Sequence, residues 1–204
     1  ATTAIAPDDT FPDVFEIVRQ GSDVTVTTNG VSVLVTPYDA SLHLVIEGSS
    51  DDDTLIVDLT GDSPLAGQVD FNAGGQQSAA GDQVQILGDG TSSVTFTADA
   101  ASLNSGTIDF GSYELAITSV EGIFVSQLAS LTVVPDGDED IVSIDSPAAT
   151  QNRITGTSDA AAISPITFSD VTDVVLDTGA SGGDDTVVFA DDLVAAGLAS
   201  FTVS

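Results

Sequence analysis

The chain has 204 residues, 42% of them hydrophobic, which is enough to bury the core of one large domain. Its 32 acidic residues stand against two arginines, and the net charge of −30 argues against a nucleic-acid partner, because binding a phosphate backbone needs cations. Cysteine is absent, which excludes disulfides, thiol catalysis and cysteine zinc sites. No apolar run approaches the roughly 18 residues that a membrane span needs, so none is expected.

The acidic residues are 27 Asp and five Glu, a bias that favours turns, since Asp readily accepts hydrogen bonds from nearby backbone amides. A surface this acidic repels itself at low salt, so we expect surroundings in which sodium, magnesium or calcium screens it. Methionine and tryptophan are absent, and few side chains are therefore open to oxidation. These features favour an extracellular or cell-surface protein.

Along the chain, residues 1–15 are expected to form an N-terminal extension, and short runs of alternating apolar and polar residues follow it. Bounded by Gly, Asp, Asn or Pro, these runs predict short strands and tight turns. The runs are residues 23–37, 41–48, 53–61, 67–74, 82–90, 92–100, 106–111, 113–120, 122–128, 130–137, 139–145, 165–171, 172–179, 185–192 and 199–204. Segments 99–103 and 191–198 are the only helical candidates, so the predicted fold class is all-β.

Two blocks of the sequence resemble each other. At an offset of 51 residues, Ile117 aligns with Phe168 and Val120 with Val171. Both blocks then lead through an acidic corner into another strand, as "DGDEDIVSID" and "GGDDTVVFAD", at an offset of 46. A third corner, "GSSDDDTLIVD", has the same form. The repetition indicates a strand, corner, strand unit with insertions of variable length.

This unit favours a parallel β-helix or β-solenoid with irregular loop insertions, in which inward Val, Ile, Leu and Phe side chains stack and acidic residues stay solvated at the corners. The alternative is an antiparallel β-sandwich of the immunoglobulin type, which also has short strands and frequent turns. We expect residues 1–204 to form one domain. The strand-like end "ASFTVS" indicates a segment of a longer or polymeric assembly.

The stretches "DTLIVDLTGDSPLAGQVDFNAGG" and "SPITFSDVTDVVLDTGASGGDDTVV" resemble the Gly/Asp-cornered β-solenoid repeats of very large exported surface proteins of planctomycetes and cyanobacteria. The resemblance covers about residues 42–192. It implies a parallel β-helical repeat from an exported protein of structural or adhesive type. The sequence departs from the pattern in "NAGGQQSAAGDQ", where an insertion enlarges the corner and weakens the case for calcium there.

Calcium is the candidate ligand, because carboxylates and carbonyls in glycine-rich loops are hard oxygen ligands. The candidate metal ligands are Asp51, Asp52, Asp53, Asp138, Asp140, Asp184 and Asp185. "GGDDTVV" is distantly similar to the calcium corners of repeats-in-toxin proteins, but it lacks the second glycine spacing and is not repeated in tandem. No cofactor is required by the fold, and the alternative to calcium is a set of solvated acidic turns.

We predict no enzymatic activity. Parallel β-helices can carry carboxylate pairs that act on polysaccharides, but sugar-binding aromatic side chains are scarce here, with two Tyr, nine Phe and no Trp. The only histidine, His43, alternates onto the face opposite Leu42 and Leu44. We expect it at an exposed or edge strand position, because it has no His or Cys to share a metal with.

The predicted function is a structural or adhesive extracellular module, such as a fibre, surface-layer or stalk subunit. It would assemble head to tail with copies of itself or neighbouring domains, through strand edges expected at residues 15–26 and 199–204. The alternative is a calcium-dependent adhesin that recognises a glycan or a partner cell. A polysaccharide-active enzyme is the third and weakest hypothesis.

Overall fold

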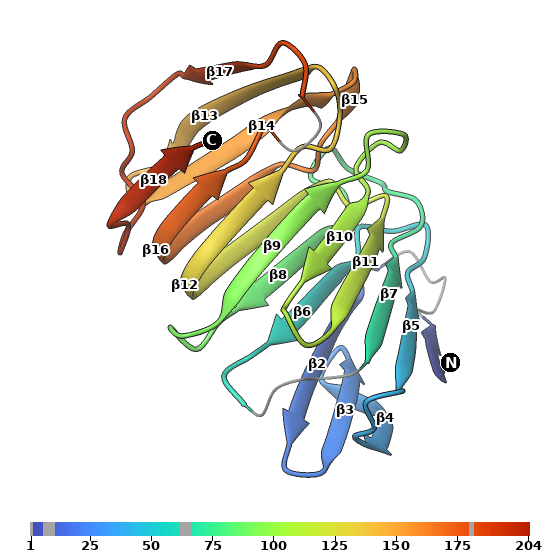
Figure 1. The fold of residues 1–204 in the computed structure, drawn as a ribbon. Coiled ribbons are helices and arrows are strands. Elements are labelled where there is room, and N and C mark those ends of the chain that lie inside the picture. Colours follow the sequence, from blue (N-terminus) through green and yellow to red (C-terminus); the bar gives the residue numbers. More distant parts are fainter. Residues whose placement is uncertain (1, 6–10, 62–66, 180–181) are drawn as a thin grey trace.

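A computed structural model describes residues 2–5, 11–61, 67–179 and 182–204, and in these residues eighteen strands join one continuous sheet (Figure 1). The strands are β1 (Thr2–Ile5), β2 (Val14–Gln20), β3 (Asp23–Thr28), β4 (Val31–Pro37), β5 (His43–Glu47), β6 (Thr54–Asp58), β7 (Gln68–Asn72), β8 (Gln83–Leu87), β9 (Ser93–Ala98), β10 (Gly106–Asp109), β11 (Glu114–Thr118), β12 (Gly122–Val134), β13 (Asp140–Ala148), β14 (Gln151–Ser158), β15 (Ala161–Ala162), β16 (Ile166–Leu176), β17 (Thr186–Phe189) and β18 (Ser200–Val203).

The all-β prediction is confirmed. The described residues contain no helix, and the two helical candidates, 99–103 and 191–198, are turns and irregular chain. Of the expected N-terminal extension, residues 2–5 join the sheet as β1, and residues 1 and 6–10 lie outside the described residues.

Parallel pairing organises most of the sheet into three ladders. Ladder A contains β1, β5, β7 and β11 in that order. Ladder B contains β2, β6, β8 and the first halves of β12 and β16. Ladder C contains β9, the second halves of β12 and β16, and β18. The chain passes from ladder A to ladder B at β5–β6, β7–β8 and β11–β12, so successive passes lie side by side (Figure 1).

Strands β12 and β16 each serve two ladders because both bend in the middle. The bends lie at Gln127, with φ of 57°, and at Asp170, with φ of 53°. These two residues occupy equivalent positions, because the register pairs Ser126 with Ser169 and Leu128 with Val171. A left-handed residue turns the chain while the pairing continues on both sides of it.

The core consists of inward side chains stacked along the ladders, as expected. The register of ladder B aligns one row of apolar residues, each no more than 1% exposed: Phe15, Leu55, Val84, Ile123 and Ile166. A row in ladder C continues the same core: Val94, Leu131, Val174 and the partly buried Phe201. Side chains of successive strands in register pack one on another, and each row buries apolar surface along its length.

The repeat alignment read from the sequence is wrong in its register. Phe168 lies beside Val125, 43 residues earlier, and not beside Ile117. At the acidic corner the sequence alignment predicts an offset of 46 residues. The hydrogen-bonded residues Asp140 and Asp185 are instead separated by 45 residues in the chain. In a pattern of period two, several shifts align apolar with apolar, so similarity alone does not select the register.

The expected strand edge at residues 15–26 is also wrong. β2 is paired on both sides, by β3 and β6, and β3 is paired by β2 and β4. The β2–β3–β4 meander therefore covers that end of ladder B, and within the described ranges β4 is its outermost strand. At the other end, β18 pairs only with β16 among the described residues.

Candidate functional site

An acidic residue directly precedes four of the five strands of ladder B, at the corner where the chain arrives from ladder A. These residues are Asp13, Asp53, Asp82 and Glu121, before β2, β6, β8 and β12. The parallel register aligns the strand starts, so the four acids follow one another across the corner. We call these four residues the acidic relay.

Main-chain hydrogen bonds connect the acidic relay from strand to strand. The N–H of Asp13 donates to Oδ1 of Asp53 over 2.9 Å, and the N–H of Asp53 donates to Oδ1 of Asp82 over 2.6 Å. The N–H of Asp82 donates to Oε2 of Glu121 over 2.8 Å. Asp13, Asp53 and Asp82 are buried, and a buried carboxylate is stabilised when it accepts such hydrogen bonds.

The neighbouring carboxylates at this corner accept hydrogen bonds from the enlarged loop. The N–H groups of Gln77 and Ser78 donate to Oδ1 of Asp52 over 2.7 and 2.9 Å. The Gln77 side-chain amide donates to Asp51, and the N–H of Ser49 donates to Oδ2 of Asp53 over 2.6 Å. The insertion in residues 72–83 thus supplies amide donors to these acids.

Asp82 is the least satisfied member of the acidic relay. It is 1% exposed, and its Oδ2 has no hydrogen-bond partner among the described residues. Burial raises the pKa of Asp82 to about 7, and the charges of Glu121, Asp53 and Asp52 add to the rise, while the hydrogen bond from Asp53 opposes it. A carboxyl with this pKa is about half protonated at neutral pH, where an ordinary Asp is ionised.

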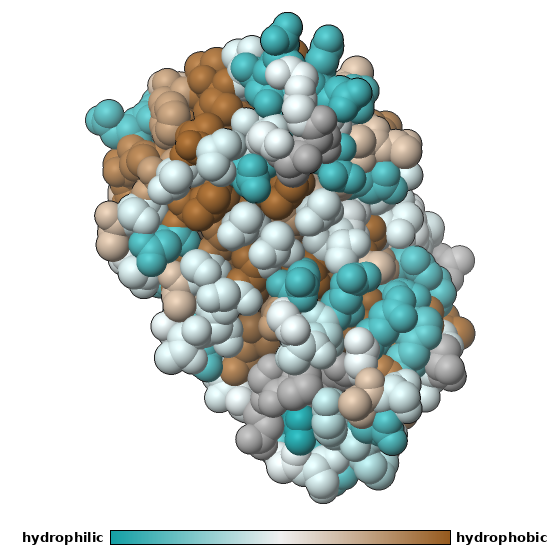
Figure 2. Space-filling model, in the orientation of Figure 1, coloured by the Kyte–Doolittle hydropathy of each residue, from teal (hydrophilic) through white to brown (hydrophobic). Residues whose placement is uncertain are grey.

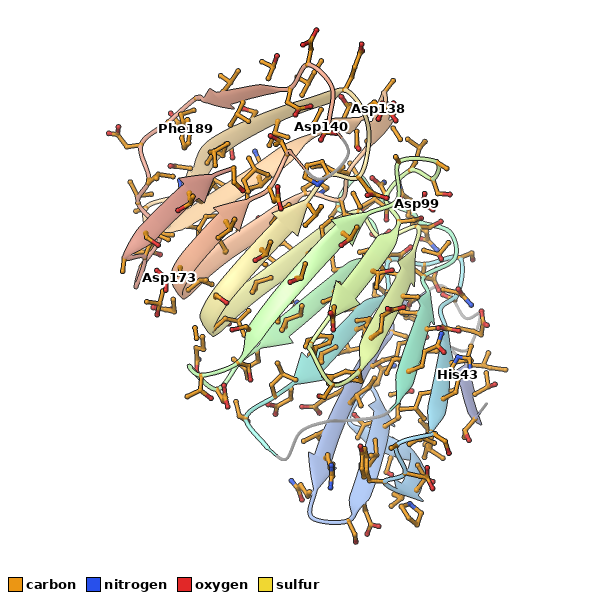
Figure 3. All side chains as sticks on the ribbon, viewed as in Figure 1. His43, Asp99, Asp138, Asp140, Asp173 and Phe189 are labelled. Atoms are coloured by element: carbon orange, nitrogen blue, oxygen red, sulfur yellow. The ribbon has the colours of Figure 1, made fainter. Side chains whose placement is uncertain are left out.

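A second acidic corner lies where the chain enters β13 and β17. We define it as Asp136, Asp138, Asp140, Asp159, Asp184 and Asp185. The register of β13 and β17 places Asp140 beside Asp185, and the N–H of Asp140 donates to Oδ1 of Asp185 over 3.1 Å. Figure 3 shows Asp138 and Asp140 together at this end of the molecule.

Asp140 is the buried centre of the second acidic corner. It is 0% exposed, and neither of its carboxylate oxygens has a hydrogen-bond partner among the described residues. Burial raises the pKa of Asp140, and the charges of Asp185, Asp159 and Asp136 raise it further, while the nearby Ser158 hydroxyl partly opposes them. The charges of three other carboxylates thus act on one buried acid.

Close backbone contact shapes this corner. Gly183 has φ of 100°, and a Cβ at that position would lie 1.3 Å from the carbonyl oxygen of Asp138. No larger residue fits there without moving the backbone. Glycine is therefore required at position 183, the second glycine of "GGDDTVV", because the backbone of residues 136–140 lies so close to it.

The seven predicted ligands fall into two separate groups: Asp51, Asp52 and Asp53 at the first corner, and Asp138, Asp140, Asp184 and Asp185 at the second. The expectation that acidic corners stay solvated is wrong for Asp51, Asp53 and Asp140, which are buried. Asp138 and Asp184 are exposed, and Asp52 and Asp185 are half-buried. Among the described residues, no three His, Asp or Glu side chains lie close enough together to hold one metal ion as they stand.

Four members of the two corners were not predicted from the sequence: Asp13, Asp82 and Glu121 in the first corner and Asp159 in the second. A local signal exists for the first three. In each case the acid stands two residues before a buried apolar residue of the core, as in "DVF", "DQV" and "EGI". The same pattern occurs at Asp53 and Asp140.

His43 lies on the outward face of β5, next to the buried Leu44, as its alternation predicts. It is half-buried, and its Nε2 lies 2.8 Å from Oδ2 of Asp70 on the adjacent strand β7. Gln68 donates to the other oxygen of Asp70 over 2.9 Å. Asp70 was not predicted from the sequence as a partner of His43, and the pairing of β5 with β7 brings the two side chains together.

Two surface cavities differ from what a polysaccharide-active site needs. One, of about 400 Å³ beside β9, β10 and β11, has Asp99 and Asp136 in its lining and no aromatic side chain. The other is a groove of about 420 Å³ on the outer face of ladder B, which includes Phe124 and the single carboxylate of Glu16. Neither cavity combines a carboxylate pair with an aromatic side chain.

The described residues include no helix that is long and apolar enough to cross a membrane. No protein-family model matches the sequence, and neither a curated protein nor a solved structure is significantly similar to this chain.

Proposed function

We propose that this chain is a parallel β-solenoid module with a structural or adhesive role outside the cell, and that it stacks end to end on copies or neighbouring domains. Ladders A, B and C support the solenoid, since a sandwich of the immunoglobulin type is built from antiparallel pairs. One observation carries the proposal: among the residues that the structure describes, strands at both ends of the sheet have an unpaired edge and expose apolar side chains.

At the C-terminal end, β17 pairs only with β13 and β18 only with β16 among the described residues. The exposed fractions there are 61% for Ile141, 48% for Val188, 50% for Phe189 and 42% for Val203. Hydrophobic surface gathers over these strands in Figure 2, at the upper left. An open edge with apolar side chains is a template for pairing with another strand.

The N-terminal end has a corresponding edge on β4. Among the described residues, β4 pairs only with β3, and its Val31, Val33 and Val35 are 66%, 53% and 60% exposed. β1 likewise pairs only with β5. Apolar edges at two different ends of one chain suit a heterologous contact, which repeats from copy to copy into a rod.

Charge sets the condition for stacking. Copies that each carry a net charge of −30 repel one another, and dissolved salt shortens the range of that repulsion to about 8 Å at physiological ionic strength. Stacking is therefore strongest at high ionic strength, which fits the proposed extracellular role in a saline environment.

Sedimentation velocity and negative-stain electron microscopy test this proposal. We expect the wild-type chain to form concentration-dependent oligomers or filaments at high salt. Val33→Asp on β4 and Val188→Asp on β17 are expected to weaken them, because a charge on an edge strand opposes pairing. Leu103→Asp is the matched control, since Leu103 is 64% exposed in the turn between β9 and β10 and belongs to neither edge strand.

A chain that stays monomeric at every concentration and salt level, with no filaments, would overturn end-to-end stacking of copies. Equal effects of the three substitutions would point to general hydrophobic association and would also count against the proposed edges.

A further inference from the structure

The acidic relay meets an asparagine side chain at each of its two ends. At one end, Nδ2 of Asn29 donates to Oδ1 of Asp13 over 2.6 Å, and at the other end Nδ2 of Asn104 donates to Oε1 of Glu121 over 3.2 Å. Both asparagines have a left-handed backbone, with φ of 51° and 50°. Asn adopts this conformation more readily than most residues, so each turn can present a neutral amide donor to a carboxylate.

Asn29 connects the turn between β3 and β4 to the start of β2. It is exposed, and together with Gly30, whose φ is 75°, it forms a two-residue turn. Its Oδ1 accepts from the N–H of Val14 over 3.0 Å, and its own N–H donates to the carbonyl oxygen of Val14 over 2.8 Å. These bonds and the bond to Asp13 hold the turn against the start of β2.

Asn29 and Gly30 also form the only Asn–Gly pair in the sequence, and asparagine is a thermolabile residue. Glycine has no side chain to hinder its own nitrogen, and a Cβ at Gly30 would meet nothing within 4 Å beyond its chain neighbours. The Gly30 nitrogen is therefore sterically open to the Cγ of Asn29. In the fold, however, the carboxamide is bonded to Asp13 and Val14, and it must leave them before it can react.

We propose that Asn29 is a deamidation site, and that its hydrogen bonds to Asp13 and Val14 protect it until the β3–β4 turn opens. In this reaction the Gly30 nitrogen bonds to Cγ of Asn29, and a cyclic imide forms. The bond from Cγ to Nδ2 breaks, and Nδ2 leaves as ammonia with the proton of the Gly30 nitrogen. Water then opens the ring at one of its two carbonyls, which gives aspartate or isoaspartate without any oxidant or reductant. The inference is independent of end-to-end stacking.

Either product would loosen the β2–β3–β4 end of the sheet. A carboxylate in place of the amide has no hydrogen to donate, and it brings a negative charge against Oδ1 of the buried Asp13. Like charges at this distance repel, and Asp13 loses a donor. Isoaspartate also adds a carbon to the backbone of a two-residue turn, whose length sets the pairing of Thr28 with Val31.

Peptide mapping by mass spectrometry, with aspartate and isoaspartate products separated, measures the reaction at each asparagine of the full chain. In urea at mildly alkaline pH we expect Asn29 to react first of the four asparagines. In the folded chain we expect its reaction to be about tenfold slower or more, because the turn must open first.

Two variants test the protecting bond. Asp13→Ala removes the acceptor of the Asn29 amide and should speed the reaction at Asn29 in the folded chain. Asp23→Ala, at an exposed position at the other end of β3, should not. Asn104 is the internal control, because general unfolding of a variant would speed its reaction too, whereas loss of the local bond acts on Asn29 alone.

Asn29→Asp reproduces one product directly. Its urea midpoint at neutral pH should be lower than that of the wild type, because the new carboxylate faces Asp13. Gln20→Glu is the matched control, since it adds the same charge at the exposed end of β2 and should shift the midpoint little.

An Asn29 that stays unmodified in urea would overturn the site, and equal rates in the folded and unfolded chain would overturn its protection by the fold. Asn29→Asp with the urea midpoint of the wild type would overturn the effect on the sheet. If Asp13→Ala fails to fold, the rates of the folded and unfolded wild-type chain still decide whether the fold protects Asn29.

Discussion

The main-chain N–H of Asp53 donates a 2.6 Å hydrogen bond to the carboxylate of Asp82, although 29 residues separate the two in the chain. The same contact repeats from Asp13 to Asp53 and from Asp82 to Glu121. Asp53 and Asp82, each directly before a strand, thus donate to one acid of the relay and accept from another. The acidic relay connects neighbouring strands of ladder B at one corner. A hydrogen bond to an ionised carboxylate contributes about 1.5–3 kcal/mol to the stability of the fold.

Replacing Asp53 with Ala is expected to destabilise the fold by roughly 3 kcal/mol. The change removes the acceptor for the N–H groups of Asp13 and Ser49, and a buried donor left unpaired costs about 1–3 kcal/mol. Urea unfolding measures the loss. Asp58→Ala is the control, because Asp58 is half-buried at the end of β6 and, among the described residues, accepts side-chain hydrogen bonds only from the adjacent Thr60. Equal losses for both variants would contradict a structural role of the relay.

Asp82→Asn should change how stability depends on pH. The pKa of Asp82 is raised to about 7 in the folded protein, from an ordinary value of about 3.9. The folded state therefore holds a proton that the unfolded chain loses first, and the stability linked to that proton is present below about pH 4 and lost as pH rises to about 7. Asn cannot ionise, and its Oδ1 still accepts from Asp53.

The measurement is the difference in free energy of unfolding between Asp82→Asn and wild type across this pH range. We expect the difference to grow in favour of the variant between about pH 4 and 7 and then to level off. A difference that does not vary with pH would show that Asp82 keeps an ordinary pKa.

Phe168→Ala should cost about 3–5 kcal/mol, since it empties a packed position in the core. Phe168 is 1% exposed and lies beside Val125 in the register of β12 and β16. Phe124, the preceding residue of β12, points outward and is 38% exposed, so Phe124→Ala should cost about 1 kcal/mol or less. Thermal unfolding of both variants checks the alternation, and similar losses would contradict it.

Gly183→Ala should disturb the second acidic corner far more than Gly182→Ala. Both glycines have positive φ, 85° at Gly182 and 100° at Gly183, but only at Gly183 would a Cβ meet the carbonyl oxygen of Asp138. Gly182→Ala should cost about 1–2 kcal/mol for backbone conformation alone. Gly183→Ala adds the clash, which should also speed hydrogen exchange of the Asp140 amide, because its bond to Asp185 is displaced. Indistinguishable exchange in the two variants would argue against this close approach.

Much of the secondary structure was predictable because it depends on local chemistry. The runs at 41–48, 53–61 and 82–90 contain β5, β6 and β8, and their inward residues Leu44, Leu55 and Val84 are buried as the alternation predicts. Strand β14 was missed, since its polar "QNRITGTS" shows little alternation. The residues of β12 were expected to form two strands, but they form one. The left-handed bend at Gln127 lies inside continuous pairing, and no glycine marks it in the sequence.

The sequence by itself determined that the chain is all-β, which faces of most strands point inward, and where acidic turns interrupt them, because alternation and turn chemistry act over a few residues. Only the tertiary structure decided which acids meet. Register between strands far apart in the chain depends on loop lengths and on packing of the whole core. That register satisfies Asp53 with backbone donors, brings Asp185 beside Asp140, and leaves the Asp140 carboxylate buried among like charges.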